Sequence, residues 1–95
     1  MILDFRCGET YLIWCGRRSR RLPQDIQDAA LRKLRLLNAA KRVEDLRVPP
    51  GSRLEPLKGD RAGWWSVHIN DQWRVCFRWD DGQGGPGDVE IVDYH

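Results

Sequence analysis

Asp93, Tyr94 and His95 are the residues of this sequence best suited to moving protons, and they follow one another at its end. A histidine has a pKa of about 6.5 in model peptides, so it can act as a general acid or base near neutral pH. The carboxylate of Asp93 beside it favours the protonated ring. The competing interpretation is a solvated tail, because chain ends often fray.

Two cations, Lys58 and Arg74, form the second candidate group. Lys58 lies in a Leu-Lys-Gly-Asp segment, and Arg74 is a polar residue within a mainly apolar segment. A lysine and an arginine that converge on one face can bind a phosphate and stabilise the charge that develops on it. The alternative is that Lys58 is a surface cation and that Arg74 pairs with an acid such as Glu90.

Other kinds of catalytic centre find little support in the sequence. The two histidines and three cysteines lack metal-ligand spacing, so neither a metal nor another cofactor is expected. His68 is interpreted as structural or solvated. Ser19 and Ser66 have no evident His and Asp partners for nucleophilic catalysis. The glycine-rich segment 80–87 precedes no helix, so it is interpreted as a flexible turn rather than a phosphate-binding loop.

The length of 95 residues supports one hydrophobic core, and residues 1–95 are therefore expected to form a single domain. Apolar residues make up 41% of the chain and include five tryptophans, which argues against disorder. No apolar run approaches the roughly 18–20 residues that a membrane span needs, and no secretory signal is visible. We therefore expect a cytoplasmic protein that does not contact a membrane.

Positive charge is concentrated in the first two-thirds of the chain. Residues 1–61 have a net charge of +6 and residues 62–95 a net charge of −4. Thirteen of the sixteen cations are arginine, which binds phosphates through paired hydrogen bonds and stacks on bases. The pattern indicates a surface for a polyanion, with nucleic acid as the leading candidate. One basic run is either a solvated turn or a contact for an RNA backbone: Arg17, Arg18, Arg20 and Arg21.

The hydrophobic pattern predicts an α+β fold. A short edge strand is expected over residues 1–5, and a short helix over residues 9–16 that ends at Gly16. A second, amphipathic helix is expected from about residue 23 to residue 40, with four apolar residues on one face: Ile26, Ala30, Leu34 and Leu37. The two helices should form a hairpin, and residues 42–62 a long surface connection.

Alternation with a period of two then predicts three antiparallel strands, in the segments 64–69, 73–79 and 89–94. A two-residue turn between the first two would place Val67 opposite Arg74. A three-residue connection places Val67 opposite Val75 and keeps the apolar residues on one face. We therefore predict the latter register. It gathers a polar set on the face away from the helices: Ser66, His68, Arg74, Arg78 and Tyr94.

Three ordered motifs resemble the HigB-type toxins of the RelE superfamily, and the similarity extends over the whole chain. They are Leu57-Lys58-Gly59-Asp60, Trp73-Arg74-Val75-Cys76-Phe77-Arg78 and Asp93-Tyr94-His95. The resemblance implies the RelE-like microbial RNase fold and the activity of a ribosome-dependent mRNA endonuclease, which cuts mRNA in the ribosomal A site without a metal. Its functional positions that match here are Lys58, Arg74, Asp93, Tyr94 and His95. Many members carry histidine where this chain has Glu55.

The residue roles that follow from the resemblance fit cleavage by the 2′-OH of the RNA itself. His95 would be the general base or acid, Asp93 would orient its ring, and Tyr94 would stack on a base or supply a proton. Lys58 and Arg74, together with Arg78, would bind the phosphate. The four arginines of the helix hairpin would contact ribosomal RNA.

The resemblance also implies partners. They are the ribosome and mRNA, and an antitoxin of the HigA type with a helix-turn-helix. Operator DNA would be bound only through this antitoxin. Two alternative functions would use the same basic surface without nuclease activity. They are a non-catalytic RNA-binding or ribosome-binding module, and a DNA-binding regulator. The second lacks an evident recognition-helix unit.

Overall fold

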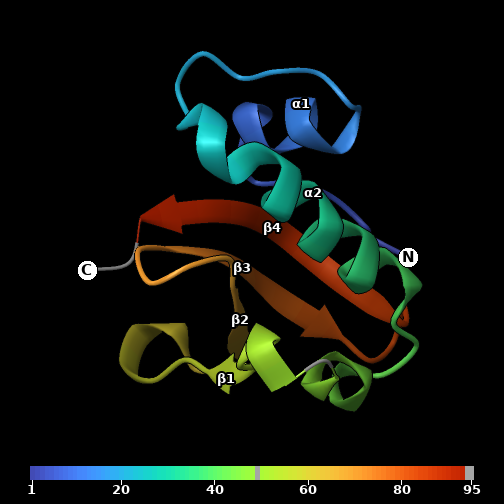
Figure 1. The fold of residues 1–95 in the computed structure, drawn as a ribbon. Helices are drawn as coiled ribbons and strands as arrows, with labels where there is room; N and C mark the ends of the chain where they lie inside the picture. The colour runs from blue at the N-terminus through green and yellow to red at the C-terminus, as the bar shows by residue number, and fades with distance from the viewer. Residues whose placement is uncertain (49, 94–95) are drawn as a thin grey trace.

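A computed structural model describes residues 1–48 and 50–93. Two helices, α1 (Gly8–Trp14) and α2 (Gln24–Ala39), cover one face of a four-stranded antiparallel sheet (Figure 1). The strands lie in the order of the sequence: β1 (Glu55–Pro56), β2 (Trp64–His68), β3 (Trp73–Asp80) and β4 (Gly85–Asp93). The predicted α+β class is confirmed. In the described part of the chain, no helix has the length and apolarity needed to cross a membrane.

The apolar face of α2 forms much of the core. The four residues that the periodicity selected, Ile26, Ala30, Leu34 and Leu37, are all buried. They pack with Val75, Phe77, Val89 and Ile91 of the sheet. The helix starts after Pro23 and ends before Ala40, within a residue of the predicted limits.

The first helix begins one residue before the predicted start and ends two residues before the predicted end, and Gly16 explains how it ends. Gly16 has a φ of +82°, a left-handed conformation that glycine adopts without the strain of a Cβ. The amide of Gly16 donates to the carbonyl of Ile13, and that of Arg17 donates to the carbonyl of Leu12. These two bonds satisfy the last carbonyls of α1 and turn the chain towards α2.

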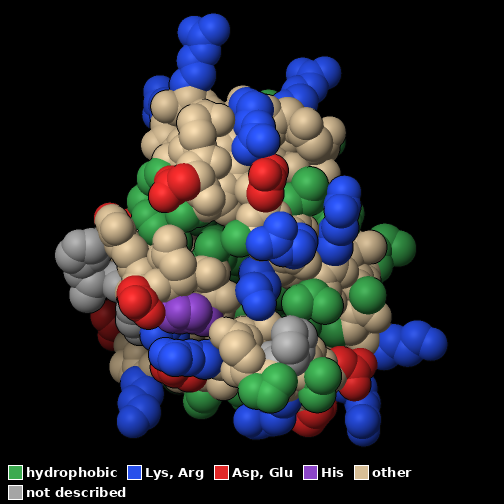
Figure 2. Space-filling model, in the orientation of Figure 1, with side chains coloured by type: hydrophobic (Ala, Val, Ile, Leu, Met, Phe, Trp, Pro, Cys, Tyr) green, Lys and Arg blue, Asp and Glu red, His purple; other side chains and the backbone are tan. Residues whose placement is uncertain are grey.

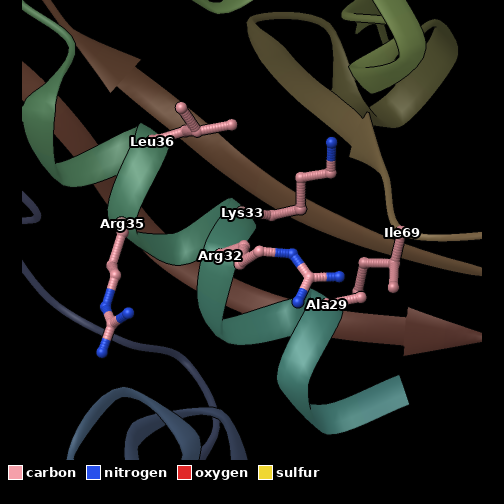
Figure 3. Close-up of a pocket in the computed structure, with 6 residues that line it drawn as sticks. All are labelled: Ala29, Arg32, Lys33, Arg35, Leu36 and Ile69. Carbon is pink, nitrogen blue, oxygen red and sulfur yellow. The ribbon is translucent and has the colours of Figure 1, made fainter. Parts of the chain in front are cut away.

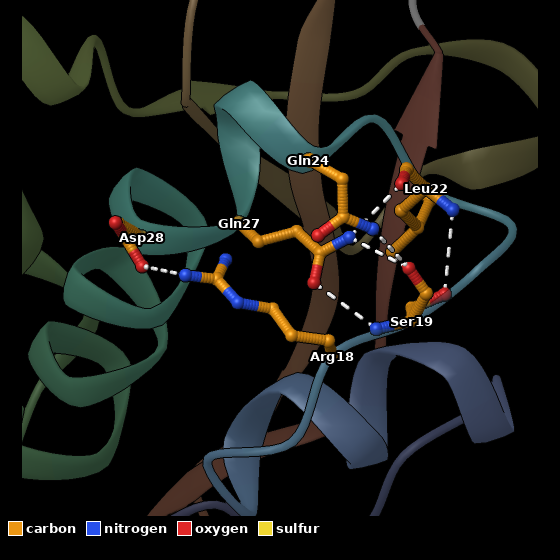
Figure 4. A network of polar contacts seen from close by, with 6 residues as sticks. All are labelled: Arg18, Ser19, Leu22, Gln24, Gln27 and Asp28. Atoms are coloured by element: carbon orange, nitrogen blue, oxygen red, sulfur yellow. Dashed lines mark hydrogen bonds and ion pairs between the residues drawn. The ribbon is translucent and has the colours of Figure 1, made fainter.

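The turn between the helices is fixed by Ser19, which is fully buried (Figure 4). The side chain of Gln27 accepts from the amide of Ser19 and donates to its carbonyl, at 3.0 and 2.9 Å. Gln24 also donates to that carbonyl, and the Ser19 hydroxyl donates to Glu9. The basic turn is therefore an ordered structure whose backbone is held from within.

The register between β2 and β3 agrees with the prediction. Val67 lies opposite Val75, and both are buried on the helix side of the sheet. His68 lies opposite Arg74, and Ser66 lies opposite Cys76. The odd-numbered connection at residues 70–72 produces this arrangement, with Asn70 Oδ1 accepting from the amides of Gln72 and Trp73.

The structure corrects the sequence analysis at three places. The segment 42–62 contributes a fourth strand, β1, which the sequence analysis did not predict. Residues 85–87, interpreted as part of a flexible turn, are buried and begin β4. The strand expected over residues 1–5 is not confirmed: Phe5 alone forms a bridge, a parallel one with Val89.

The last two corrections concern segments that lie side by side. The N-terminal segment runs along β4, where the amide of Leu3 donates to Pro86 and that of Arg6 donates to Val89. A Cβ at Gly85 would lie 2.1 Å from the carbonyl oxygen of Met1. Glycine at position 85 therefore allows the two backbones to approach, which is a long-range requirement.

Candidate RNA-cleavage site

The sheet face opposite the helices carries the predicted site residues. Because side chains alternate along a strand, the observed register places Ser66, His68, Arg74 and Arg78 on this face. β4 adds Val92, which lies opposite Arg74, and its last residue, Asp93, lies opposite Trp73. Tyr94 and His95, also predicted for this face, lie outside the described residues.

Arg74 is held from two sides. Its Nη1 lies 3.3 Å from Glu55 Oε2 in an ion pair and donates a 3.2 Å hydrogen bond to Ser66 Oγ. The Arg74 side chain is 16% exposed and the Glu55 side chain 53% exposed. The acid that pairs with Arg74 is thus Glu55 of β1, whereas the sequence analysis suggested Glu90. The Arg74 guanidinium is therefore oriented before any ligand binds. Water can replace Glu55 as its partner, because half of the Glu55 side chain is exposed.

Lys58 lies three residues beyond Glu55, on the connection from β1 to β2. It precedes the 3-10 turn Gly59–Arg61 (η3) and is exposed. The amide of Leu57 donates to the carbonyl of Trp64 at 2.8 Å, which ties this connection to the start of β2. Lys58 and the acid that holds Arg74 therefore come from the same edge of the sheet.

Asp93 and Arg78 lie on different faces of the sheet. Asp93 is opposite Trp73, so alternation places it on the helix side, whereas Arg78 is on the face opposite the helices. Asp93 Oδ2 accepts a 3.0 Å hydrogen bond from Gln72 Nε2 of the β2–β3 connection. Arg78 is exposed, and its Nε donates to Asp88 Oδ2 at 2.7 Å. Arg78 therefore lies away from Arg74 along β3, close to Trp64, its partner in β2.

His68, which is half-buried, and Cys76, which is buried, also lie on the face opposite the helices. Burial lowers the pKa of His68, and the positive charges of Arg53, Arg74 and Lys33 lower it further, against the opposing effect of Asp71. The ring is therefore neutral at pH 7. Burial raises the pKa of the Cys76 thiol, which makes it a poor nucleophile at this pH.

The basic turn lies apart from Arg74. Arg17, Arg18, Arg20 and Arg21 are exposed on the α1–α2 connection, on the helix side of the sheet and far from β1 (Figure 1). Arg18 forms a 3.1 Å ion pair with Asp28, in which both side chains are mostly exposed. The structure thus separates the two groups of cations that the sequence analysis selected.

A further basic cavity was missed by the sequence analysis. It has a volume of about 450 Å³ and lies between α2 and the end of β2 (Figure 3). Its lining is Ala29, Arg32, Lys33, Arg35, Leu36 and Ile69. Lys33 Nζ donates to Ser52 Oγ at 2.8 Å, and burial lowers its pKa. Figure 2 shows basic side chains gathered over the middle of this view, next to a histidine. Arg32, Lys33 and Arg35 lie on the polar side of the predicted amphipathic helix, and the sequence analysis assigned no site to them.

Comparison with solved structures places this architecture in a known class. A YoeB/ParE toxin from Agrobacterium tumefaciens superposes with a TM-score of 0.54 over 99% of this chain and 97% of that one, at 22% identity. The chain therefore has the same α+β fold as this protein. The model of the family described as "RelE-like toxin of type II toxin-antitoxin system HigB" matches residues 12–95, and the chain belongs to this family.

Two curated relatives agree with that assignment. Toxin HigB-1 of Vibrio cholerae is 47% identical over 66 residues, which are 70% of this chain and 70% of that protein. A protein of Proteus vulgaris called Endoribonuclease HigB is 42% identical over 42 residues, which are 44% of this chain and 40% of that protein. Membership of a type II system implies an antitoxin as a partner.

Proposed function

We propose that this toxin is a ribosome-dependent mRNA endonuclease that cuts mRNA in the ribosomal A site by attack of the RNA's own 2′-OH. The observation that carries the proposal is Arg74, a guanidinium oriented by Glu55 and Ser66 on the sheet face opposite the helices. It lies beside the strand that leads into Asp93-Tyr94-His95. The name of the Proteus vulgaris relative supports an endoribonuclease.

The reaction assigns a role to each residue. A base removes the proton of the 2′-OH, whose oxygen bonds to the adjacent phosphorus, while an acid protonates the departing 5′ oxygen. The products are a 2′,3′-cyclic phosphate and a 5′-OH. His95 acts as base or acid and Asp93 orients it, while Tyr94 stacks on a base or supplies the second proton. Arg74 and Lys58 bind the phosphate, and Arg78 binds the RNA beside it.

The ribosome contributes orientation. Holding the 2′-OH in line with the phosphate supplies roughly 7–11 kcal/mol of a barrier. This toxin accordingly works in the cytoplasm with the ribosome and mRNA as partners. An antitoxin of the HigA type, with a helix-turn-helix, neutralises it and carries any contact with operator DNA.

The test compares Arg74→Ala with Arg47→Ala, a control that removes an exposed arginine outside the site. Both proteins should fold like the parent. Arg74→Ala should cut mRNA on ribosomes about a hundredfold more slowly or worse, and Arg47→Ala should cut at the parent rate. Parent-like cleavage by Arg74→Ala contradicts the phosphate role.

Two further measurements test the chemistry itself. A 2′-deoxy nucleotide at the cut position should abolish cleavage, and deletion of His95 should slow it about a hundred- to ten-thousand-fold without lowering the melting temperature. Growth arrest with intact mRNA would favour a non-catalytic ribosome-binding module instead. Efficient cutting of naked RNA would contradict the dependence on the ribosome.

A further inference from the structure

Trp64, the first residue of β2, is surrounded by three arginines from separate parts of the chain. The guanidinium carbon of Arg61 lies 4.8 Å from the centroid of the indole ring, that of Arg6 lies 5.7 Å away and that of Arg78 5.9 Å away. Arg6 belongs to the N-terminal segment, Arg61 to η3 and Arg78 to β3. The ring itself is half-buried. We call these four residues the Trp64 cluster.

The charge of the Trp64 cluster is poorly neutralised. Arg78 pairs with Asp88, but within residues 1–48 and 50–93 neither Arg6 nor Arg61 takes part in an ion pair. Three guanidinium groups around one ring repel one another, and the cation–π attraction at an exposed site is only about 0.5–1 kcal/mol each. An anion bound between them would relieve this repulsion.

The Trp64 cluster is continuous with the candidate cleavage site. Arg74 and Arg78 lie on the same face of β3, about 13 Å apart at 3.3 Å per residue. The buried thiol of Cys76 lies between them, and both Arg61 and Arg74 are close enough to act on its pKa. A single RNA strand that places its scissile phosphate at Arg74 and follows β3 therefore reaches the Trp64 cluster.

We propose that the Trp64 cluster binds a nucleotide of the mRNA that neighbours the scissile phosphate. The base stacks on the flat face of the Trp64 indole and on the arginine guanidinium groups beside it. The arginines also contact the phosphate of that nucleotide. Aromatic and arginine surfaces in a positively charged groove are the common basis of single-strand binding without base reading. This inference rests on the proposed function, since it assigns a second subsite to the same RNA.

The test measures affinity without cleavage. A short fluorescent single strand of 2′-O-methyl RNA has no free 2′-OH, so the protein can bind it but not cut it. Fluorescence anisotropy should show at least about fivefold weaker binding for Arg61→Gln and for Trp64→Leu. The control, Arg47→Gln, makes the same charge change at an exposed arginine outside both proposed RNA surfaces and should bind within about twofold of the parent. Arg61 lies on a short surface turn, so its variant decides the test if Trp64→Leu does not fold.

An abasic strand separates stacking from charge. The parent should bind the abasic strand about as weakly as Trp64→Leu binds the complete strand. Trp64→Leu should bind the abasic strand almost as well as it binds the complete strand. Equal binding by Arg61→Gln and Arg47→Gln overturns the inference. It is also overturned if removal of the base weakens binding to Trp64→Leu as much as it weakens binding to the parent. Cleavage on ribosomes by the parent is measured in parallel. If the parent cuts and the variants bind normally, the subsite is wrong and the nuclease stands; if the parent does not cut, the proposed function fails.

Discussion

Arg74 owes its orientation to Glu55, which makes Glu55 a positioning residue of the proposed site. Many members of the family are expected to carry a histidine at this position, so the chain uses a carboxylate where a relative would use an imidazole. The carboxylate holds the guanidinium in the absence of RNA, and half of its side chain remains exposed. An incoming phosphate can therefore take over the Arg74 hydrogen bonds without leaving a buried charge unpaired.

Replacing Glu55 tests this positioning role. We expect Glu55→Ala to slow ribosomal cleavage about tenfold to a hundredfold, because the displaced guanidinium no longer meets the phosphate at the correct distance. The free energy of unfolding should change by less than about 1 kcal/mol, since half of the Glu55 side chain is exposed and Arg74 keeps its hydrogen bond to Ser66. Single-turnover cleavage and urea unfolding measure the two quantities, and Glu55→Gln, which keeps an acceptor, should recover part of the rate. If Glu55→Ala lowered the free energy of unfolding by as much as it raised the activation free energy of cleavage, the positioning role would be contradicted.

His68 contributes a pH dependence to stability. Its Nδ1 is buried and has no hydrogen-bond partner among the described residues, and burial lowers the pKa of the ring from its ordinary value of 6.5. Above that value neither the folded nor the unfolded chain protonates the ring. As the pH falls below it, the unfolded chain binds a proton that the folded chain excludes, so stability falls.

The pH effect of His68 is measured by urea unfolding of the parent and of His68→Gln between pH 8 and pH 5. We expect the parent to lose more stability than the variant below about pH 6.5. His95 and the carboxylates are present in both proteins, so their contributions cancel in the comparison. Parallel curves for the two proteins would show that the folded chain protonates His68 as readily as the unfolded one.

At the scale of elements, β4 depends on the N-terminal segment that lies along it. We expect Gly85→Ala to destabilise the fold by about 1–3 kcal/mol, because the added methyl group meets the Met1 carbonyl and must displace that segment. Gly51→Ala is the matched control, since nothing lies within 4 Å of a Cβ there. Urea unfolding of both variants gives the comparison, and equal stabilities would show that the N-terminal segment moves aside at no cost.

The elements differ in how far the sequence could predict them. The register of β2 and β3 followed from local alternation, because only one offset keeps Val67 and Val75 on the same face. The start of β4 could not be predicted, since Gly85 and Gly87 carry no side chain that alternates. Residues 85–87 pair with residues 78–80 of β3, and their other side is covered by the N-terminal segment, about 80 positions away in the sequence.

The candidate site was predicted in its residue types but not in its contacts. Lys58, Arg74, Arg78 and Asp93 were selected from their types and positions, and the structure places Arg74 and Arg78 on one sheet face. The ion pair with Glu55 depends on β1, a strand of two residues that contains a proline and has no pattern. The Trp64 cluster draws on three distant segments and left no signal in the sequence.

At the scale of the whole molecule, the sheet separates two basic surfaces. The proposed cleavage face carries Arg74 and the Trp64 cluster, and the α1–α2 connection carries a second group of arginines on the helix side (Figure 1). A toxin that acts within the ribosome can use one surface for mRNA and the other for ribosomal RNA. The buried Ser19 keeps the second surface in a fixed shape.

The second surface is tested by replacing Arg20 and Arg21 with glutamine. We expect weaker binding to ribosomes and a salt dependence whose slope falls by about 0.7 for each lost phosphate contact. The free energy of unfolding should stay within about 0.5 kcal/mol of the parent value, because both side chains are exposed. Arg35 and Arg47, changed together in the same way, give the control with equal charge. Identical salt slopes for the two double variants would mean that the basic turn does not contact the ribosome.

The pairing of residues 3–6 with β4 also joins an early-synthesised part of the chain to a late one. A cell adds about 5–20 residues per second to a growing chain, and the first residues wait several seconds for their partners at positions 86–89. Until then the core lacks Val89 and Ile91, and Arg74 has no strand beside it at Val92. Translation therefore spends most of its time on a chain in which this pairing, and the strand beside Arg74, have not yet formed.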